Sequence, residues 1–144
     1  MSKSSEAILC FNQGFNCSQA VLSTYCENLG LDKTTALKLS CAFGGGMGRI
    51  GETCGAVTGA LMLIGLKYGK CNADDNESKD KTYQLVQKFA NSFRAEFGSV
   101  RCKDILKFDI SKQEEHDQAR DSGVFKTVCP NLVKRAVEIV EDIL

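Results

Sequence analysis

The sequence predicts an all-α fold: a single-domain helical bundle of about six to eight helices spanning residues 1–144. Apolar residues recur at i, i+3 and i+4 along most of the chain, which is the spacing of amphipathic helices. The chain contains one proline, so few positions interrupt a helix. No segment alternates apolar and polar residues convincingly, and residues 107–110 and 122–128 are the only weak strand candidates.

Capping signals place three helices before a glycine-rich segment. The first covers residues 5–13. Asn16 can cap the second helix, which Gly30 ends. Asp32 can cap the third helix, which extends to about Phe43.

The glycine-rich residues 44–52 are predicted to form a loop, after which Thr53 can cap a fourth helix that reaches about Tyr68. The loop contains a G-x-G-x-x-G pattern, which follows a strand in dinucleotide-binding proteins. Here a helix precedes the pattern and no Gly-Lys-Ser/Thr ends it, so a nucleotide-phosphate site is disfavoured. The glycines instead allow positive φ and a close approach of the backbone to another group.

The second half of the chain begins with a polar connector, residues 70–80, followed by the longest apolar stripe, which ends at Phe97. Three further helices have predicted starts. Ser99 can cap a short turn, Ser111 can cap a very polar helix, and Pro130 suits the first turn of the last helix.

The charge balance and the length of the apolar runs exclude two classes of partner. Lys and Arg total 18, as do Asp and Glu, so the net charge is zero and we expect no nucleic-acid partner. The longest apolar run, residues 56–66, is shorter than the roughly 20 residues of a spanning helix, so we expect no membrane insertion. The first residues lack the apolar core of a signal peptide, which predicts a cytoplasmic location.

The eight cysteines are the unusual feature of the composition. A chain of this length buries a core without disulfides, so in a reducing compartment cysteines serve as core residues, metal ligands or redox groups. Four of them fall in predicted first turns of helices and are called here the first-turn cysteines: Cys17, Cys54, Cys102 and Cys129. A helix N-terminus favours the thiolate, and Arg49 and Arg101 lie close in sequence to two of these thiols.

Two glycines give the helix after Cys54 a small-residue face. Gly55 and Gly59 predict close packing on a neighbouring helix, or on the same helix of a second subunit in a homodimer. They also leave room beside Cys54. Together with Arg49, they are the predicted cofactor-binding residues.

The remaining cysteines and the single histidine have simpler interpretations. Cys10, Cys26 and Cys41 are predicted to be small buried apolar residues. Cys71 lies in the polar connector and is predicted to be a surface thiol. His116 lies in a run of polar residues and is predicted to be a solvated side chain.

The order of Cys17, the CGAVTG block at residues 54–59, Cys102 and Cys129 resembles the C_GCAxxG_C_C family of redox-active proteins. The surrounding text, GFNCSQAV and GGGMGRIGETCGAVTGALM, is similar to that family as well. The resemblance implies a small helical protein whose first-turn cysteines are the catalytic redox groups, acting with a redox partner that the sequence does not identify. A more distant resemblance to the non-haem part of split-Soret cytochromes implies an iron–sulfur site.

The first-turn cysteines have no C-x-x-C spacing, so their sulfurs can meet only through the tertiary fold. Four thiolates suit an iron–sulfur cluster or another thiolate-bound metal, and two pairs suit thiol–disulfide exchange. We therefore predict a redox protein in which these cysteines bind a cluster or metal, or cycle as disulfides. The alternatives are a zinc-binding or sensing module without electron transfer and a helical dimerising interaction module. No acid–base residue defines a reaction, so enzyme activity is left open.

Overall fold

Ten α-helices and one 3-10 turn make up the computed structural model, which describes all of residues 1–144. They are α1 (Lys3–Asn12), α2 (Cys17–Tyr25), η1 (Glu27–Leu29), α3 (Lys33–Cys41), α4 (Gly44–Met47), α5 (Gly55–Tyr68), α6 (Asn76–Phe97), α7 (Cys102–Leu106), α8 (Gln113–Ser122), α9 (Val124–Thr127) and α10 (Cys129–Glu141). Eight helices have five residues or more, and α4 and α9 are single turns of 4 residues. The all-α prediction is therefore confirmed.

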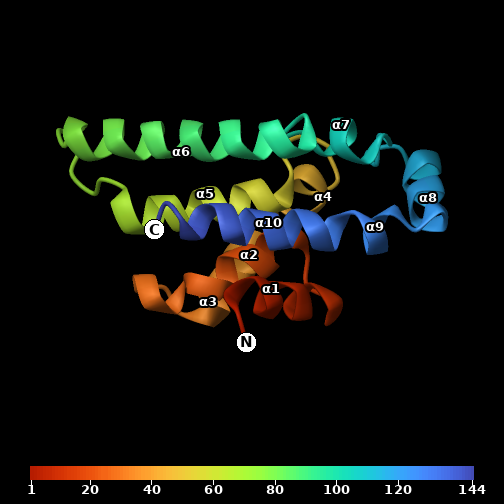
Figure 1. Ribbon diagram of the computed structural model, residues 1–144, viewed down its shortest axis with the longest axis horizontal. Helices are drawn as coiled ribbons and strands as arrows, with labels where there is room; N and C mark the ends of the chain where they lie inside the picture. The colour runs from red at the N-terminus through yellow and green to blue at the C-terminus, as the bar shows by residue number, and fades with distance from the viewer.

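The helices are stacked in tiers (Figure 1). Helix α6 lies along one side, α5 and α10 form the middle, and α1 and α3 lie on the opposite side. Helix α2 contacts α1, α3, α5 and α10, so it joins the outer helices to the middle tier. Helices α7, α8 and α9 extend beyond one end of this stack, at the right of Figure 1. None of the helices combines the length and the apolar composition that crossing a bilayer requires.

Helix α5 lies at the centre because it has almost no polar side chains. Its residues 55–60 are all buried, and the helix packs against α2, α6 and α10. A Cβ atom at Gly59 would lie 2.8 Å from the carbonyl oxygen of Ser18 and 3.0 Å from Cβ of Val21, so only glycine allows α2 to come this close. The small-residue face is thus covered by α2 of the same chain, and a dimer cannot use it.

Several predicted helix ends are confirmed by their hydrogen bonds. Asn16 forms a capping box with Gln19, and the Asp32 carboxylate accepts a hydrogen bond from the backbone N–H of Thr35. Gly98 ends α6 and Gly123 ends α8, each with a φ of 82°. Local sequence therefore determines these boundaries.

Three predicted caps are wrong. Helix α5 begins after Cys54, with Thr53 one residue outside, and α7 and α8 begin without a side-chain cap from Ser99 or Ser111. The Ser99 hydroxyl instead bonds the Asp104 carboxylate at 2.9 Å. The predicted third helix is also too long, since α3 ends at Cys41, and α6 begins within the predicted connector, where the Asp75 side chain caps it. Neither strand candidate is a strand: residues 124–127 form α9, and residues 107–110 are irregular.

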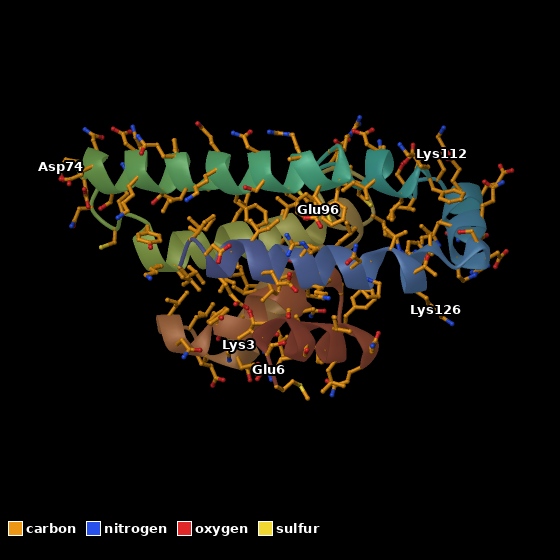
Figure 2. All side chains as sticks on the ribbon, in the orientation of Figure 1. Lys3, Glu6, Asp74, Glu96, Lys112 and Lys126 are labelled. Carbon is orange, nitrogen blue, oxygen red and sulfur yellow. The ribbon has the colours of Figure 1, made fainter.

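Buried apolar side chains form a large core and a small one. The large core gathers side chains of α2, α5, α6 and α10, among them Phe89 and Phe93 of α6. The small core consists of Cys102, Leu106, Ile110, Ala119 and Cys129. Charged side chains project from the periphery, as Figure 2 shows for Asp74, Lys112 and Lys126. Glu96 of α6 pairs instead with Arg135 of α10 at 2.8 Å, which ties the two helices together.

Candidate functional site

A cavity of about 350 Å³ lies where the starts of α2, α5, α7 and α10 meet. All four first-turn cysteines line it, and none of the other four cysteines does. Three of them are the first residues of their helices, namely Cys17 of α2, Cys102 of α7 and Cys129 of α10, whereas Cys54 is the residue preceding α5. The fold thus brings together sulfurs that are far apart in sequence, each carried by a different helix start.

Cys17 and Cys129 form the first pair of thiols. Hydrogen bonding with Cys129 is the first cause that raises the pKa of Cys17 well above its usual value, and the same interaction lowers the pKa of Cys129. Deprotonating the pair therefore leaves the charge on Cys129, with the Cys17 thiol donating to it.

Cys54 and Cys102 form the second pair, which the backbone holds in place. Thr53 and Arg101 form an isolated antiparallel bridge. On either side of it, the Cys54 N–H donates to Val100 at 2.8 Å and the Cys102 N–H donates to Glu52 at 2.6 Å. Side chains alternate between the two faces of extended backbone. Cys54 and Cys102, which follow the two bridged residues, therefore lie on the same face as diagonal neighbours. The bridge thus places the two cysteines together, although 47 residues separate them in the chain.

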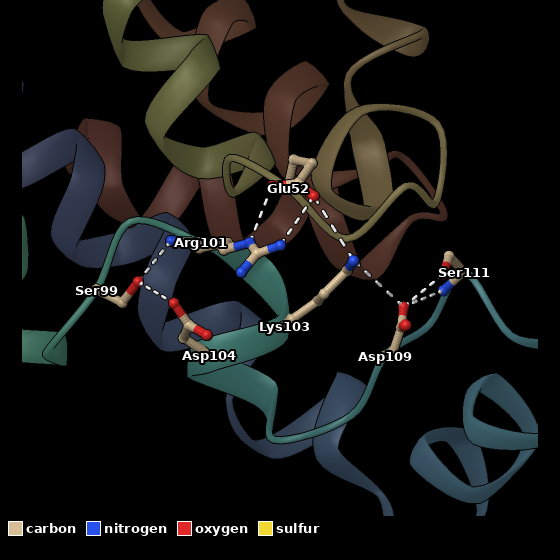
Figure 3. A network of polar contacts seen from close by, with 7 residues as sticks. All are labelled: Glu52, Ser99, Arg101, Lys103, Asp104, Asp109 and Ser111. Carbon is tan, nitrogen blue, oxygen red and sulfur yellow. Dashed lines mark hydrogen bonds and ion pairs between the residues drawn. The ribbon is translucent and has the colours of Figure 1, made fainter.

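Ion pairs reinforce this bridge (Figure 3). The Arg101 guanidinium donates two hydrogen bonds to the Glu52 carboxylate, at 2.9 and 3.0 Å. The Lys103 ammonium lies 3.6 Å from the Glu52 carboxylate and 3.8 Å from that of Asp109. Because Glu52 matches the charge of Arg101, this arginine does not stabilise the thiolate of Cys102. Its role is to join the two segments that carry Cys54 and Cys102.

The thiolate expectation is wrong for three of the four sulfurs. Burial raises the pKa of Cys54 to about 11 and that of Cys102 to about 12, and the pKa of Cys17 is raised as well. Hydrogen bonds from the N–H groups at the start of α5 lower the pKa of Cys54, but the loss of water around the sulfur outweighs them. Only Cys129 has a lowered pKa, and its cause is hydrogen bonding with Cys17 rather than the helix start.

Glycines let the backbone approach the sulfurs. A Cβ atom at Gly46 would lie 2.7 Å from Cβ of Cys102, and one at Gly55 would lie 3.2 Å from Cβ of Cys17. Gly46 also has a φ of 65°, which a side chain disfavours. Of the predicted cofactor-binding residues, Gly55 and Arg49 line the cavity and Gly59 does not.

His116 is a member of this site that the sequence interpretation misses. Its imidazole lines the cavity rather than pointing into solvent, with the side chain 14% exposed. The ring packs on Phe125, with centroids 5.4 Å apart. Its Nδ1 atom is buried without a hydrogen-bond partner, and the Asp117 carboxylate, 4.0 Å away, is too distant to accept one. The sequence does hold a signal for this position. His116 lies three residues before Ala119, the one buried residue of α8, and so lies near the same face of the helix.

The other cysteines lie away from the cavity. Cys26 is buried and Cys71 is exposed, as predicted, whereas Cys10 is only partly buried, packed against the large core. Cys41 is exposed, so the prediction that it is buried is wrong. The buried face of α3 carries Ala36 and Ser40, and the next residue along the helix turns outward.

The donor set limits the kind of metal site. No three of the His, Cys, Asp and Glu side chains are grouped closely enough to hold one metal ion in this arrangement. The four sulfurs line one cavity, where Cys17 interacts with Cys129, and where Cys54 and Cys102 each follow one residue of the backbone bridge. Cysteine sulfurs are the donors that bind iron–sulfur clusters and zinc in proteins.

Comparison with known proteins gives one match. The model of the family described as "Putative redox-active protein (C_GCAxxG_C_C)" matches residues 15–143, a range that contains all four first-turn cysteines and His116. No curated protein matches the chain. No solved structure matches it either.

Proposed function

Because the chain belongs to the C_GCAxxG_C_C family of redox-active proteins, we propose that the first-turn cysteines hold a [2Fe–2S] centre used for electron transfer. The observation that carries this proposal is the convergence of these four sulfurs, and no other cysteine, on one cavity.

The pairing of the sulfurs supports a binuclear centre. A [2Fe–2S] cluster is bound by four cysteines, two on each iron. Cys17 and Cys129 would bind one iron, and Cys54 and Cys102 the other. The cavity that all four sulfurs line gives space that a simple dithiol does not need. When bound, such a centre supplies one-electron transfer.

The chain's own residues set the conditions for binding. The thiols of Cys17, Cys54 and Cys102 have raised pKa values, so loading a metal must release protons from them. The apolar side chains Ile105 and Leu132 in the cavity wall exclude water from the sulfurs. Gly46 lets the backbone lie against Cys102 and so keeps that sulfur in place.

One observation favours a second candidate, a dithiol–disulfide couple at Cys17 and Cys129. Each of these thiols shifts the pKa of the other, and the lowered pKa of Cys129 makes it the better nucleophile. Oxidation would form one S–S bond and release two protons and two electrons to an acceptor such as another disulfide. A zinc-binding module without electron transfer is the remaining alternative, and the lack of a three-ligand group disfavours it.

Metal and thiol analysis after anaerobic purification tests the proposal. We expect two irons and two acid-labile sulfides per chain with visible absorption. Changing any first-turn cysteine to serine should lower the iron content severalfold. Cys41→Ser and Cys71→Ser are matched controls, because both thiols are exposed and distant from the cavity, and they should retain the iron.

The other outcomes select the alternatives. Colourless protein that forms a reversible Cys17–Cys129 disulfide, identified by peptide mass spectrometry, would replace the cluster with the dithiol couple. Stoichiometric zinc without redox activity would select the zinc module. Protein with no metal and with four inert cavity thiols would contradict every redox reading of the site.

A further inference from the structure

Two polar side chains in the cavity wall lack partners within the chain. His116 Nδ1 is the only buried side-chain nitrogen or oxygen in the protein without a hydrogen bond. Buried polar atoms are almost always paired, and an exception commonly marks the position of a missing ligand or water. The exception here lies on the same cavity as the first-turn cysteines.

Arg49 is the second such side chain. It is the only lining residue with a permanent charge. It forms no ion pair, in contrast to the nearby arginine Arg101. Its aliphatic stem lies over Gly45, with Cγ 3.1 Å from the position of a Cβ atom there, so glycine at this position accommodates the arginine.

No carboxylate near the cavity is free to neutralise this arginine. Glu52 is shared by Arg101 and Lys103, and Asp109 pairs with Lys103. Arg49 is an exposed residue, so the cavity carries one unpaired, solvent-accessible positive charge beside a largely apolar wall that includes Phe11, Ile110 and Phe125. A guanidinium in such surroundings favours an anion that accepts hydrogen bonds.

We propose that the cavity binds a small organic anion, with its acidic group on Arg49 and its apolar body against Phe11, Ile110 and Phe125. His116 donates to the same ligand through Nδ1 in the tautomer that carries its proton on that nitrogen, the buried atom without a partner in the chain. The functional role of this anion site rests on the proposed function, because the site places the anion beside the redox sulfurs. The binding itself requires only the cavity and these side chains.

Calorimetric titration of the protein as purified with octanoate and with octanamide, its neutral analogue, tests the proposal. We expect octanoate to bind about tenfold or more tightly than octanamide. Arg49→Met should remove this preference and Arg49→Lys should retain part of it. His116→Phe, which keeps a ring against Phe125, should weaken octanoate binding severalfold.

Arg94→Met is the matched control, because Arg94 lies on α6 outside the cavity and bonds only Asn91. It should leave the preference unchanged. Equal affinity for the two probes, no binding of either, or an unchanged preference in Arg49→Met would each overturn the proposal. Iron and thiols are assayed on the same samples. Protein that retains iron but does not prefer octanoate would contradict the anion site alone. Metal-free protein with inert thiols that still prefers octanoate would contradict the redox function alone.

Discussion

At the scale of single residues, the four cavity thiols differ although they occupy equivalent positions at helix starts. Cys129 gains a hydrogen bond from Cys17, which stabilises its charged form and lowers its pKa. Cys54 and Cys102 have no such donor thiol, and burial raises the pKa of both. The immediate neighbour of each sulfur thus outweighs the helix start that carries it.

This difference predicts the order of alkylation in metal-free protein. At pH 7, iodoacetamide should modify Cys129 faster than Cys17, Cys54 or Cys102, because the thiolate is the reacting form. The Cys129 rate should fall as the pH is lowered through its pKa, since protonation removes the thiolate, whereas Cys54 should need a pH near 11 to become half ionised. Peptide mass spectrometry measures each site, and comparable rates for Cys129 and Cys102 would contradict the assignment.

At the scale of elements, packing of α5 on α2 depends on where glycine is placed. A Cβ atom at Gly59 would meet the Ser18 carbonyl oxygen at 2.8 Å, whereas one at Gly65 meets nothing within 4 Å. Both residues lie within α5, so they differ in surroundings rather than in backbone conformation.

The two glycines should therefore respond oppositely to alanine. Gly59→Ala should destabilise the protein by about 1–3 kcal/mol, because the methyl group forces α2 and α5 apart. Gly65→Ala should stabilise it by about 0.5–1 kcal/mol, because alanine restricts the unfolded chain and favours the helix. Urea unfolding of the two variants measures both changes. A loss of stability in Gly65→Ala would show that the outer face of α5 is covered in solution.

The elements also show what local sequence can predict. Asn16 caps the start of α2 and Gly98 caps the end of α6, each through hydrogen bonds to residues within one turn. The local sequence pattern is therefore enough to predict both boundaries. Thr53 and Ser99 have the same local signature but are wrong as caps. Thr53 lies in a bridge with Arg101, and the Ser99 hydroxyl is bonded to a carboxylate, so partners outside the helix terminus decide their roles.

At the scale of the whole molecule, the cavity lies between a well-packed body and a loosely attached end. Helices α2, α5 and α10 contact one another and supply most of the large core. Helix α8 contacts mainly α9 and buries only Ala119. His116 thus reaches the cavity from a helix with little buried surface, which extends past the end of α6 (Figure 1).

This asymmetry predicts uneven hydrogen exchange. Backbone amides of residues 113–122 should exchange more than about tenfold faster than those of α5 and α10, because few buried contacts oppose local opening of α8. Exchange followed by mass spectrometry gives the comparison, and octanoate should slow exchange in α8 if it bridges Arg49 and His116. Protection of α8 equal to that of α10 would contradict the predicted looseness.

The sequence by itself determined the helical class, most helix boundaries and the four cysteines at helix starts, because periodicity and capping depend on residues within one turn of each other. The tertiary structure alone decided that the four sulfurs meet at one cavity, since the bridge between Thr53 and Arg101 joins residues that no local pattern connects. It also decided which thiol has a lowered pKa and that His116 lines the cavity. Burial and charge at a site are sums over neighbours from several helices, and only the folded chain brings those neighbours together.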